Sequence, residues 1–272
     1  MIIIAGKPGW PIFAGKHCMM KNPFLYLAIL IVFVVSVVDA QVLNIERERI
    51  KTDTVGWSGT GKLSLNMVSN TKKFTEAGLG LHIQYKTLRS LYLALSDYEL
   101  IKSTEDDFSN KGMQHLRYNY KLTKTITLEA FTQAQFNKVL GLDFRGLVGT
   151  GPRFKIIGAD HFRVYAATAY MFEYEEPAGN LDTERNHRLS SYLSLTLKLN
   201  ENLSLINTSY YQPRFGRLND YRLSHNLDLL IKLNKNISYS LALEHLTDNH
   251  PIPGIPGKVY SIKNRLVFDF GR

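Results

Sequence analysis

The sequence has a single cysteine, no long apolar run after Ala40 and no sustained helical period in the same part. Its one cysteine among 272 residues, Cys18, lies in a segment that we expect to be removed, so the remaining chain is expected to have neither disulfides nor thiol chemistry. Mean hydropathy is −0.15, which by itself does not indicate a membrane protein. The net charge of +9 is compatible with nucleic-acid binding. However, the basic residues are scattered and no nucleic-acid motif occurs, so we expect no nucleic-acid partner.

The one long apolar run, Phe24–Val38, predicts a secretory signal peptide. Lys21 precedes it, and Val38 and Ala40 are the small residues of a cleavage site after Ala40. The run is shorter than the about 20 residues of a transmembrane helix, and an uncleaved anchor is the alternative. Residues 1–19 look like an extension upstream of the usual start. We therefore divide the chain into extension and signal peptide (1–40), a polar periplasmic leader (41–55) and a β-barrel (56–272). Removing 1–40 takes away three lysines and one aspartate and leaves a net charge of +7.

From Gly56 onward, apolar and polar residues alternate with a period of two, which is typical of strands with two unlike faces. The stretch "YRLSHNLDLLIKLNKNISYSLALEHL" (221–246) reads as two such strands joined by a tight turn, and twelve strands can be traced in all. The apolar faces are expected to include Leu91, Leu93 and Leu95 in one strand and Leu142 in another. The segment 203–212 is the least regular, because Leu203 and Leu205 share a face with Asn207 and Ser209, and a bulge or a phase error is possible there.

The connections between these strands alternate in length. The short ones repeat a pattern of three polar residues between strands, a length common in hairpins: "KLTKTIT" (121–127), "KLNENLS" (198–204) and "KLNKNIS" (232–238). The others are longer and more polar. This order favours hairpin after hairpin over the crossings and short strands of a soluble sandwich.

Closure of twelve strands into an up-and-down barrel removes unpaired edges. Leucines on the inside would leave a wide apolar space, whereas leucines on the outside would meet lipid, with aromatic residues near the strand ends as girdles. The fold class predicted is all-β: a transmembrane up-and-down antiparallel β-barrel of 12 strands. Short turns would face the periplasm of a Gram-negative bacterium and long loops the outside. Outer-membrane lipid is then the expected partner, the cell outer membrane the location, and a soluble β-protein the alternative.

Three stretches carry a resemblance to a known family: "VGTGPRFKI" (148–156), "YQPRFGRLNDYRLSHNLDLLIKLNKNISYSLALEH" (211–245) and the terminal "VFDF" (267–270). Over most of 56–270 the chain resembles a family of outer-membrane β-barrels of unknown function, the salt-induced outer membrane proteins. The resemblance implies the fold and the compartment but no substrate. Such barrels end on an aromatic residue that the barrel-assembly machinery reads, and here Phe270 is followed by Gly271 and Arg272.

The polar faces carry charges of both signs, and two interpretations remain open. One is a narrow channel whose basic excess (Arg145, Arg153, Arg163, Arg265) favours small anions. The other is a plugged structural or adhesive barrel, filled by a mesh of cross-strand ion pairs and acting through its outer loops. The candidate lumen residues are Glu76, His82, His115, Arg117, Glu129, Asp143, Arg145, Arg153, Arg163, Glu173, Arg188, Asp228, Glu244, Lys263, Arg265 and Asp269.

Catalysis is a weaker hypothesis, since no nucleophile motif is present. A lipid-modifying enzyme would need a serine beside a histidine, and Ser190 or Ser194 would meet one only by chance. His225 falls on the lipid-facing side. We expect no enzyme, no cofactor and no metal. "HPIPGIPG" (250–257) is either a gating loop or a stiff connector, the latter being favoured, and Gly149 and Gly151 give room to large neighbours or bend the strand.

Overall fold

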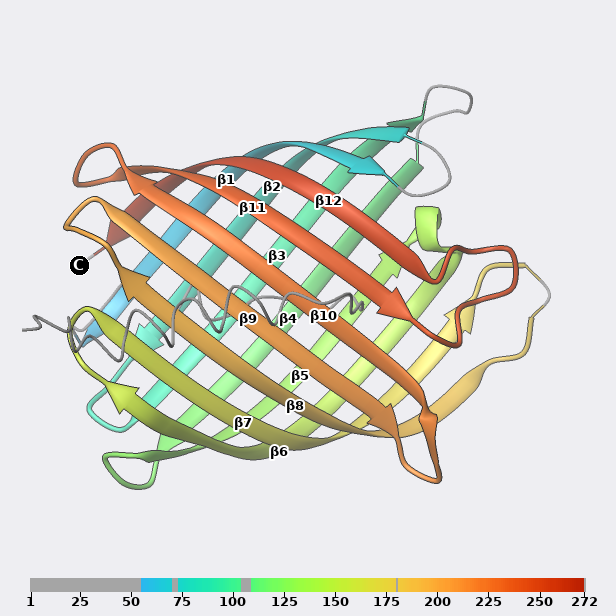
Figure 1. Cartoon of the computed structure of the whole chain (residues 1–272), viewed down its shortest axis with the longest axis horizontal. Coiled ribbons are helices and arrows are strands. Elements are labelled where there is room, and N and C mark those ends of the chain that lie inside the picture. Colours follow the sequence, from blue (N-terminus) through green and yellow to red (C-terminus); the bar gives the residue numbers. More distant parts are fainter. Residues whose placement is uncertain (1–54, 70–72, 104–108, 180, 272) are drawn as a thin grey trace, which may run out of the picture. The chain divides into compact units, whose positions relative to one another are not determined.

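The computed structural model describes residues 55–69, 73–103, 109–179 and 181–271. The predicted signal peptide and all but Val55 of the predicted leader lie outside the described residues. Within them, twelve antiparallel strands follow one another around a closed barrel, in which β1 pairs with both β2 and β12 (Figure 1). The strands are β1 (Gly56–Ser69), β2 (Lys73–Lys86), β3 (Ser90–Ser103), β4 (Ser109–Lys121), β5 (Ile126–Asn137), β6 (Leu142–Gly158), β7 (Phe162–Pro177), β8 (Glu184–Lys198), β9 (Leu203–Arg214), β10 (Arg217–Lys232), β11 (Ile237–Asp248) and β12 (Lys258–Gly271).

A short 3-10 turn, η1 (Lys138–Leu140), precedes β6. None of the helical structure in the described part of the chain is long and apolar enough to cross a membrane. The predicted closed, all-β, up-and-down barrel of twelve strands is confirmed.

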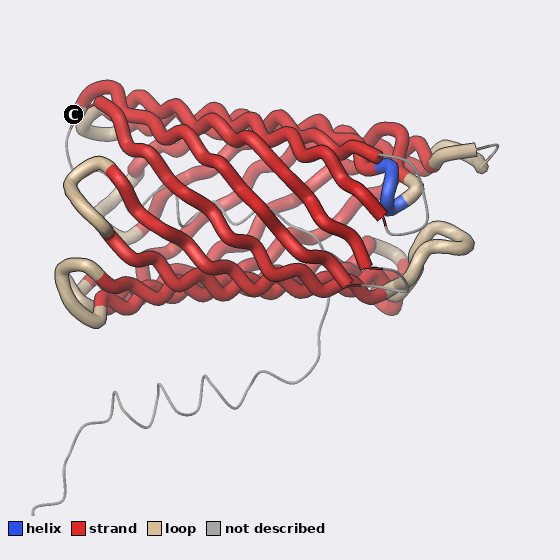
Figure 2. Tube along the Cα trace, turned by 90° about the horizontal axis from the view of Figure 1, so that it is seen from above, coloured by secondary structure: helices blue, strands red, loops and turns tan. Residues whose placement is uncertain are grey.

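The two ends of the barrel differ, as Figure 2 shows from above. At one end, which we call the turn end, five short connections join β2 to β3, β4 to β5, β6 to β7, β8 to β9 and β10 to β11. Strand β12 ends at the same end, where Gly271 pairs with Ser58 near the start of β1. The three repeated sequences form the same turn there: Leu122, Leu199 and Leu233 each donate their N–H to a carbonyl at the start of the next strand. The third residue of each motif supplies a side-chain oxygen that accepts backbone N–H groups, as Asn234 does from Ile237 at 2.8 Å. The opposite end, with η1 and the 249–257 loop, we call the loop end.

The alternation places apolar side chains outside and polar side chains inside. Leu65 and Leu79 are 62% and 64% exposed, whereas Ser194 and Thr208, on the other face, are fully buried. Along the turn end, Trp57, Tyr85, Tyr92 and Tyr118 form a row of rings with centroids 4.9, 6.4 and 4.9 Å apart. The barrel therefore has an apolar outer surface and a polar interior, which agrees with the predicted orientation of the strand faces.

Strand β3 corrects one prediction. Leu93 and Leu95 are 3% and 2% exposed and form a small apolar cluster inside the barrel, whereas Tyr92 points outward and is 49% exposed. The reason is register: Tyr92 pairs with Tyr85 and Tyr118, so the aromatic row fixes which side of β3 faces out. The leucine count of a strand is thus a poorer guide to its outer face than its cross-strand partners.

The suspected bulge in 203–212 does not occur, because β9 pairs with β10 in unbroken register from Leu203 to Pro213. The glycine prediction holds for its first alternative at Gly149, beside a large side chain, whereas Gly151 lies close to the backbone of the next strand. A Cβ on Gly149 would lie 2.4 Å from the Phe131 ring, and one on Gly151 would lie 2.1 Å from the carbonyl oxygen of Thr168. Both glycines therefore give room to close neighbours.

Candidate functional site: a charged barrel interior

The predicted lumen residues lie on the inner face with one exception. Those that are buried or in contact with other inner side chains are Glu76, His82, His115, Arg117, Glu129, Arg145, Arg153, Arg163, Glu173, Arg188, Asp228, Glu244, Lys263, Arg265 and Asp269. The exception is Asp143, whose exposed carboxylate pairs with Lys138. A register shift between β6 and β7 at Leu142 and Phe144 breaks the alternation there. Leu142, expected outside, is buried at 1% exposure.

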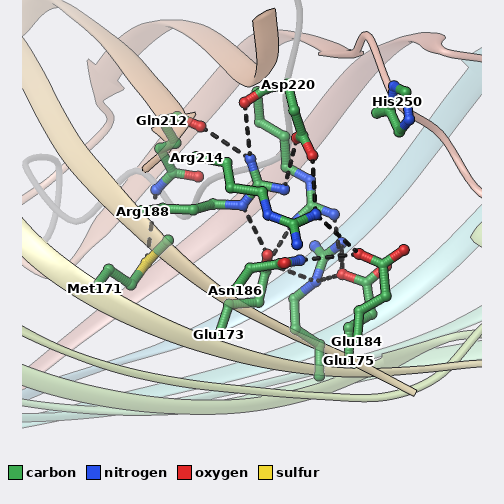
Figure 3. A network of polar contacts seen from close by, with 12 residues as sticks. Met171, Glu173, Glu175, Glu184, Asn186, Arg188, Gln212, Arg214, Asp220 and His250 are labelled. Atoms are coloured by element: carbon green, nitrogen blue, oxygen red, sulfur yellow. Dashed lines mark hydrogen bonds and ion pairs between the residues drawn. The ribbon is translucent and has the colours of Figure 1, made fainter. Parts of the chain in front are cut away.

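One group of mostly buried charges lies near the loop end, and we call it the loop-end network: Arg145, Glu173, Glu175, Arg188, Arg214, Asp220, Arg222 and Asp248. Figure 3 shows Arg188 between Glu173 and Asp220. Its Nε lies 2.8 Å from Glu173 Oε2 and one terminal nitrogen lies 2.9 Å from Asp220 Oδ1. Another terminal nitrogen donates to the Gln212 carbonyl at 3.2 Å. Arg188 is 2% exposed, and a guanidinium so buried is stable only with such a set of acceptors.

Glu173 is the centre of this network. It is 1% exposed and contacts Arg145 at 3.3 Å, Arg188 at 2.8 Å and Arg222. Arg222 continues to Glu175 at 2.9 Å and to Asp248 at 2.6 Å. Charge-assisted bonds are about twice as strong as neutral ones, so this network fixes strands β6 to β11 to one another inside the barrel.

A second group, the β12 network, joins the other side of the barrel: Glu76, Glu99, Lys111, Asp228, Glu244, Lys263 and Arg265. Lys263 Nζ lies 3.0 Å from Glu244 and 3.3 Å from Glu99. Lys111 Nζ lies 2.8 Å from Glu76 and 3.0 Å from Glu99. Arg265 contacts Glu244 at 2.6 Å and Asp228 at 3.4 Å. Two of the arginines expected to favour anions, Arg145 and Arg265, are therefore neutralised by carboxylates.

A third group surrounds Glu129 near the middle of the turn half. Glu129 accepts from Arg117 at 2.9 Å and from the Tyr192 hydroxyl at 3.1 Å, and Arg153 lies 3.8 Å away. His115 contacts Gln133 at 2.9 Å. These contacts tie the carboxylate to strands β4, β6 and β8.

Several contacts span the lumen instead of following its wall. Twelve strands about 4.8 Å apart and tilted about 40° enclose a backbone barrel roughly 24 Å across, and strands three places apart are then roughly 17 Å from each other. Arg222 on β10 nevertheless reaches Glu173 on β7, and Lys263 on β12 reaches Glu99 on β3. Tyr192 on β8 likewise reaches Glu129 on β5. Side-chain contacts between strands that are not neighbours reduce the free width of the lumen.

The loop end also carries an apolar cover. Residues of the 249–257 loop and of η1 line a cavity of about 40 Å³ together with Arg145 and Arg222: Leu140, Leu142, Pro251, Ile252, Ile255 and Pro256. Gly141 closes η1 in the left-handed conformation, and a Cβ there would lie 3.2 Å from Ile255. The proline-rich loop thus packs on the loop-end network.

A polar patch on the outer face surrounds His225 on β10. His225 Nδ1 lies 2.8 Å from Ser209 Oγ, and its Nε2 lies 3.1 Å from Asn207 Nδ2. An amide NH₂ can only donate, so Nε2 accepts and Nδ1 carries the proton. The imidazole then donates to Ser209 and cannot remove its proton, as a catalytic base would have to. These contacts satisfy polar groups on an apolar face. Of the serines considered, Ser190 bonds Gln212 and Ser194 bonds Thr208.

No group of three or more potential metal ligands occurs among the residues that the structure describes. Sequence reasoning overlooked Glu99, Lys111, Glu175, Asp220 and Arg222 as lumen residues. The signal was available for four of them, because Lys111, Glu175, Asp220 and Arg222 share the parity of a residue selected on the same strand. Glu99 shares the parity of Leu93 and Leu95, which the sequence placed on the outer face.

The comparisons with known proteins agree with this geometry. The sequence matches the profile of a family described as "Protein of unknown function, DUF481" over residues 62–270. A search of curated proteins found no match. Two solved structures share the fold. The NanC porin has 10% sequence identity and a TM-score of 0.53, covering 76% of this chain and 98% of its own. An outer-membrane channel from Pseudomonas putida F1 has 13% identity and a TM-score of 0.54, covering 81% and 97%.

Proposed function

Because the chain belongs to the DUF481 family of proteins of unknown function, its role has to be inferred from its geometry, and we propose that it is a narrow outer-membrane channel for small anionic solutes. The observation that carries the proposal is the inversion of the barrel: leucines and aromatic rings outside, charged and amide side chains inside. Lipid requires every backbone group of a spanning element to be paired, and a closed barrel meets that requirement. Two solved structures of the same fold are described as a porin and an outer-membrane channel.

The outer surface supports a membrane position with a defined orientation. The turn-end row from Trp57 to Tyr118 forms one aromatic girdle. Rings near the loop end form the other, among them Tyr211 with Tyr221 and Tyr170 with Phe215. In bacterial outer-membrane barrels the short turns face the periplasm, so the turn end would face inward. Assembly by the barrel-assembly machinery and a signal peptide ending at Ala40 belong to the same proposal.

The anion preference comes from the turn half of the lumen, where Arg153 and Arg163 line an open cavity. In the loop half of the lumen, carboxylates neutralise the arginines, so these arginines add hydrogen bonds between strands but little net positive charge. A solute would therefore meet a positive mouth at one end and a tight, neutral constriction at the other.

Planar-bilayer recordings with the purified, folded protein test this function. We expect small, discrete current steps and, in a salt gradient, a reversal potential of the sign that anion passage gives. Fractionation into the outer membrane and a gel mobility that changes on heating should accompany them. Stable insertion without current would refute the channel, and a cation-selective current would refute the anion preference.

A closed barrel that works through its outer loops is the second candidate, and the contacts between strands that are not neighbours favour it. Arg222–Glu173 and Lys263–Glu99 each join strands three places apart, and the 249–257 loop covers the loop-end network. The same recordings separate the two candidates, because a barrel closed by these contacts inserts into the bilayer and passes no current.

A further inference from the structure

A cavity opens into the lumen at the turn end. It has a volume of about 220 Å³, roughly that of seven water molecules in the liquid. Its walls come from the turn between β2 and β3, the turn between β4 and β5, and the ends of β6 and β7. Together with Arg153, six further cations line it: Lys86, Arg89, Lys121, Lys124, Lys155 and Arg163.

The sign of the charge in this cavity is one-sided. None of the described residues that line it is Asp or Glu. The turn-end carboxylates Asp160 and Asp269 are not part of the lining, and Arg153 lies 3.8 Å from the carboxylate of Glu129. In the loop-end network, by contrast, Arg145, Arg188 and Arg222 each have carboxylates within 3.3 Å. The described lining of this cavity thus has seven cations and no carboxylate of its own.

The cavity is also shaped by ordered side chains. Arg153 lies over the Tyr165 ring, with its guanidinium carbon 3.7 Å from the centroid, a contact that holds the cation in one position. Asn119 and Thr196, 5% and 3% exposed, supply neutral hydrogen-bonding groups deeper in the same cavity. Several cations around one small space match an anion with more than one negative charge, since each oxygen can then receive its own donor.

We propose that the turn-end cavity is a binding site for a small, multiply charged oxyanion, of the phosphate or polycarboxylate class. The inference deepens the proposed channel function and rests on it for transport, because the site would concentrate such anions at the periplasmic mouth. Binding itself does not require conductance. The volume excludes large polymers from full occupancy, and the open lumen side favours a soluble anion over the headgroup of a lipid.

Binding of pyrophosphate to the purified full chain in phosphatidylcholine nanodiscs, measured by calorimetry, tests the site. We expect saturable binding of one pyrophosphate, weaker binding of inorganic phosphate and none of chloride. The variant K121Q/K155Q/R163Q removes three lining cations from three strands. It should weaken pyrophosphate binding about tenfold or more at low ionic strength, given the Coulomb energies of exposed charges.

The matched control is K198Q/K232Q/K235Q, which removes three cations from the same end but outside the lining. It should change the dissociation constant by less than about twofold, since screened distant charges contribute little. Equal losses in both variants, or binding that never saturates, would overturn the site in favour of a diffuse positive end. Loss of wild-type binding when phosphatidylglycerol replaces a third of the lipid would overturn the soluble anion in favour of a lipid phosphate. Heat-dependent gel mobility verifies that each variant is folded.

Conductance recorded on the same preparations keeps the two proposals apart. Pyrophosphate binding by a barrel that passes no current would refute the channel and leave the site. Current without saturable pyrophosphate binding would refute the site and leave the channel.

Discussion

Replacing Glu173 by glutamine (E173Q) removes one negative charge from the centre of the loop-end network while preserving the size of the side chain. Three guanidiniums lose a carboxylate partner: Arg145 at 3.3 Å, Arg188 at 2.8 Å and Arg222. A charge-assisted hydrogen bond contributes about 1 kcal/mol more than a neutral one, which gives roughly 3 kcal/mol for the three. Removing one partner of a buried ion pair costs about 3–5 kcal/mol. We therefore expect E173Q to lower the free energy of unfolding by about 3–4 kcal/mol.

The assay is urea unfolding in phospholipid vesicles, followed by the fluorescence of Trp57. Once residues 1–40 are removed, Trp57 is the one tryptophan of the chain, and it is 64% exposed on the outer face, so its emission reports loss of the lipid surroundings. With a urea dependence of about 3 kcal/mol per molar, the unfolding midpoint should fall by about 1 M. E184Q is the matched control, because Glu184 is 53% exposed and 3.9 Å from Arg214. Its effect should stay within about 0.5 kcal/mol.

A double-mutant cycle then tests whether Glu173 acts through Arg222. Each single variant leaves the charge of the other residue without its partner, whereas the double variant E173Q/R222Q removes both charges. The double variant should therefore be more stable, by about 1–3 kcal/mol, than the sum of the two single effects predicts. If E173Q and E184Q shift the midpoint equally, or if the cycle is additive, the buried network does not hold the barrel together and the reasoning fails.

Three further predictions concern other parts of the barrel. Leu116 is 56% exposed at the middle of β4, so L116R should cost about 2–4 kcal/mol in vesicles and reduce the heat-modifiable form relative to L116I. G151A should lower the urea midpoint because its Cβ would lie 2.1 Å from the Thr168 carbonyl oxygen, whereas G61A, with no atom within 4 Å, should not; equal effects would contradict the close packing. Ile255 packs over η1, so I255N should raise single-channel conductance above that of I255L, and unchanged current would show that this cover does not restrict the passage.

How much of this could be read from the sequence depends on whether the information is local. Alternation in 221–246 fixes two faces per strand, and the repeated turn motifs fix the hairpins, because both depend on neighbours in the chain. Strand β3 shows the limit. Its leucines and Tyr92 compete for the outer face, and the choice is made by Tyr85 and Tyr118 on adjacent strands.

The charged interior was predictable in composition but not in pairing. Parity identifies Glu173 and Arg188 as inward residues, yet nothing in the spacing indicates that Arg222, three strands away, reaches the same carboxylate. Asp143 shows the converse, since one register shift moves a residue of the right parity out to the rim. Which arginines carry net charge into the lumen depends on contacts of this kind.

This distinction changes what the basic composition means. Arg145 and Arg265 were expected to attract anions, but each contacts two carboxylates and adds little to the field of the lumen. Arg163 lies in a cavity whose described lining has no Asp or Glu. We therefore expect the positive electrostatic potential of the lumen to fall from the turn end toward the loop end. The number of arginines at each depth does not by itself determine this potential. In the proposed channel, an anion that enters from the turn end would meet its strongest attraction first and the electrically balanced loop-end network afterwards. Current through such a pore should be rectified in a membrane with a fixed orientation, and the K121Q/K155Q/R163Q variant should reduce that rectification while E173Q should not.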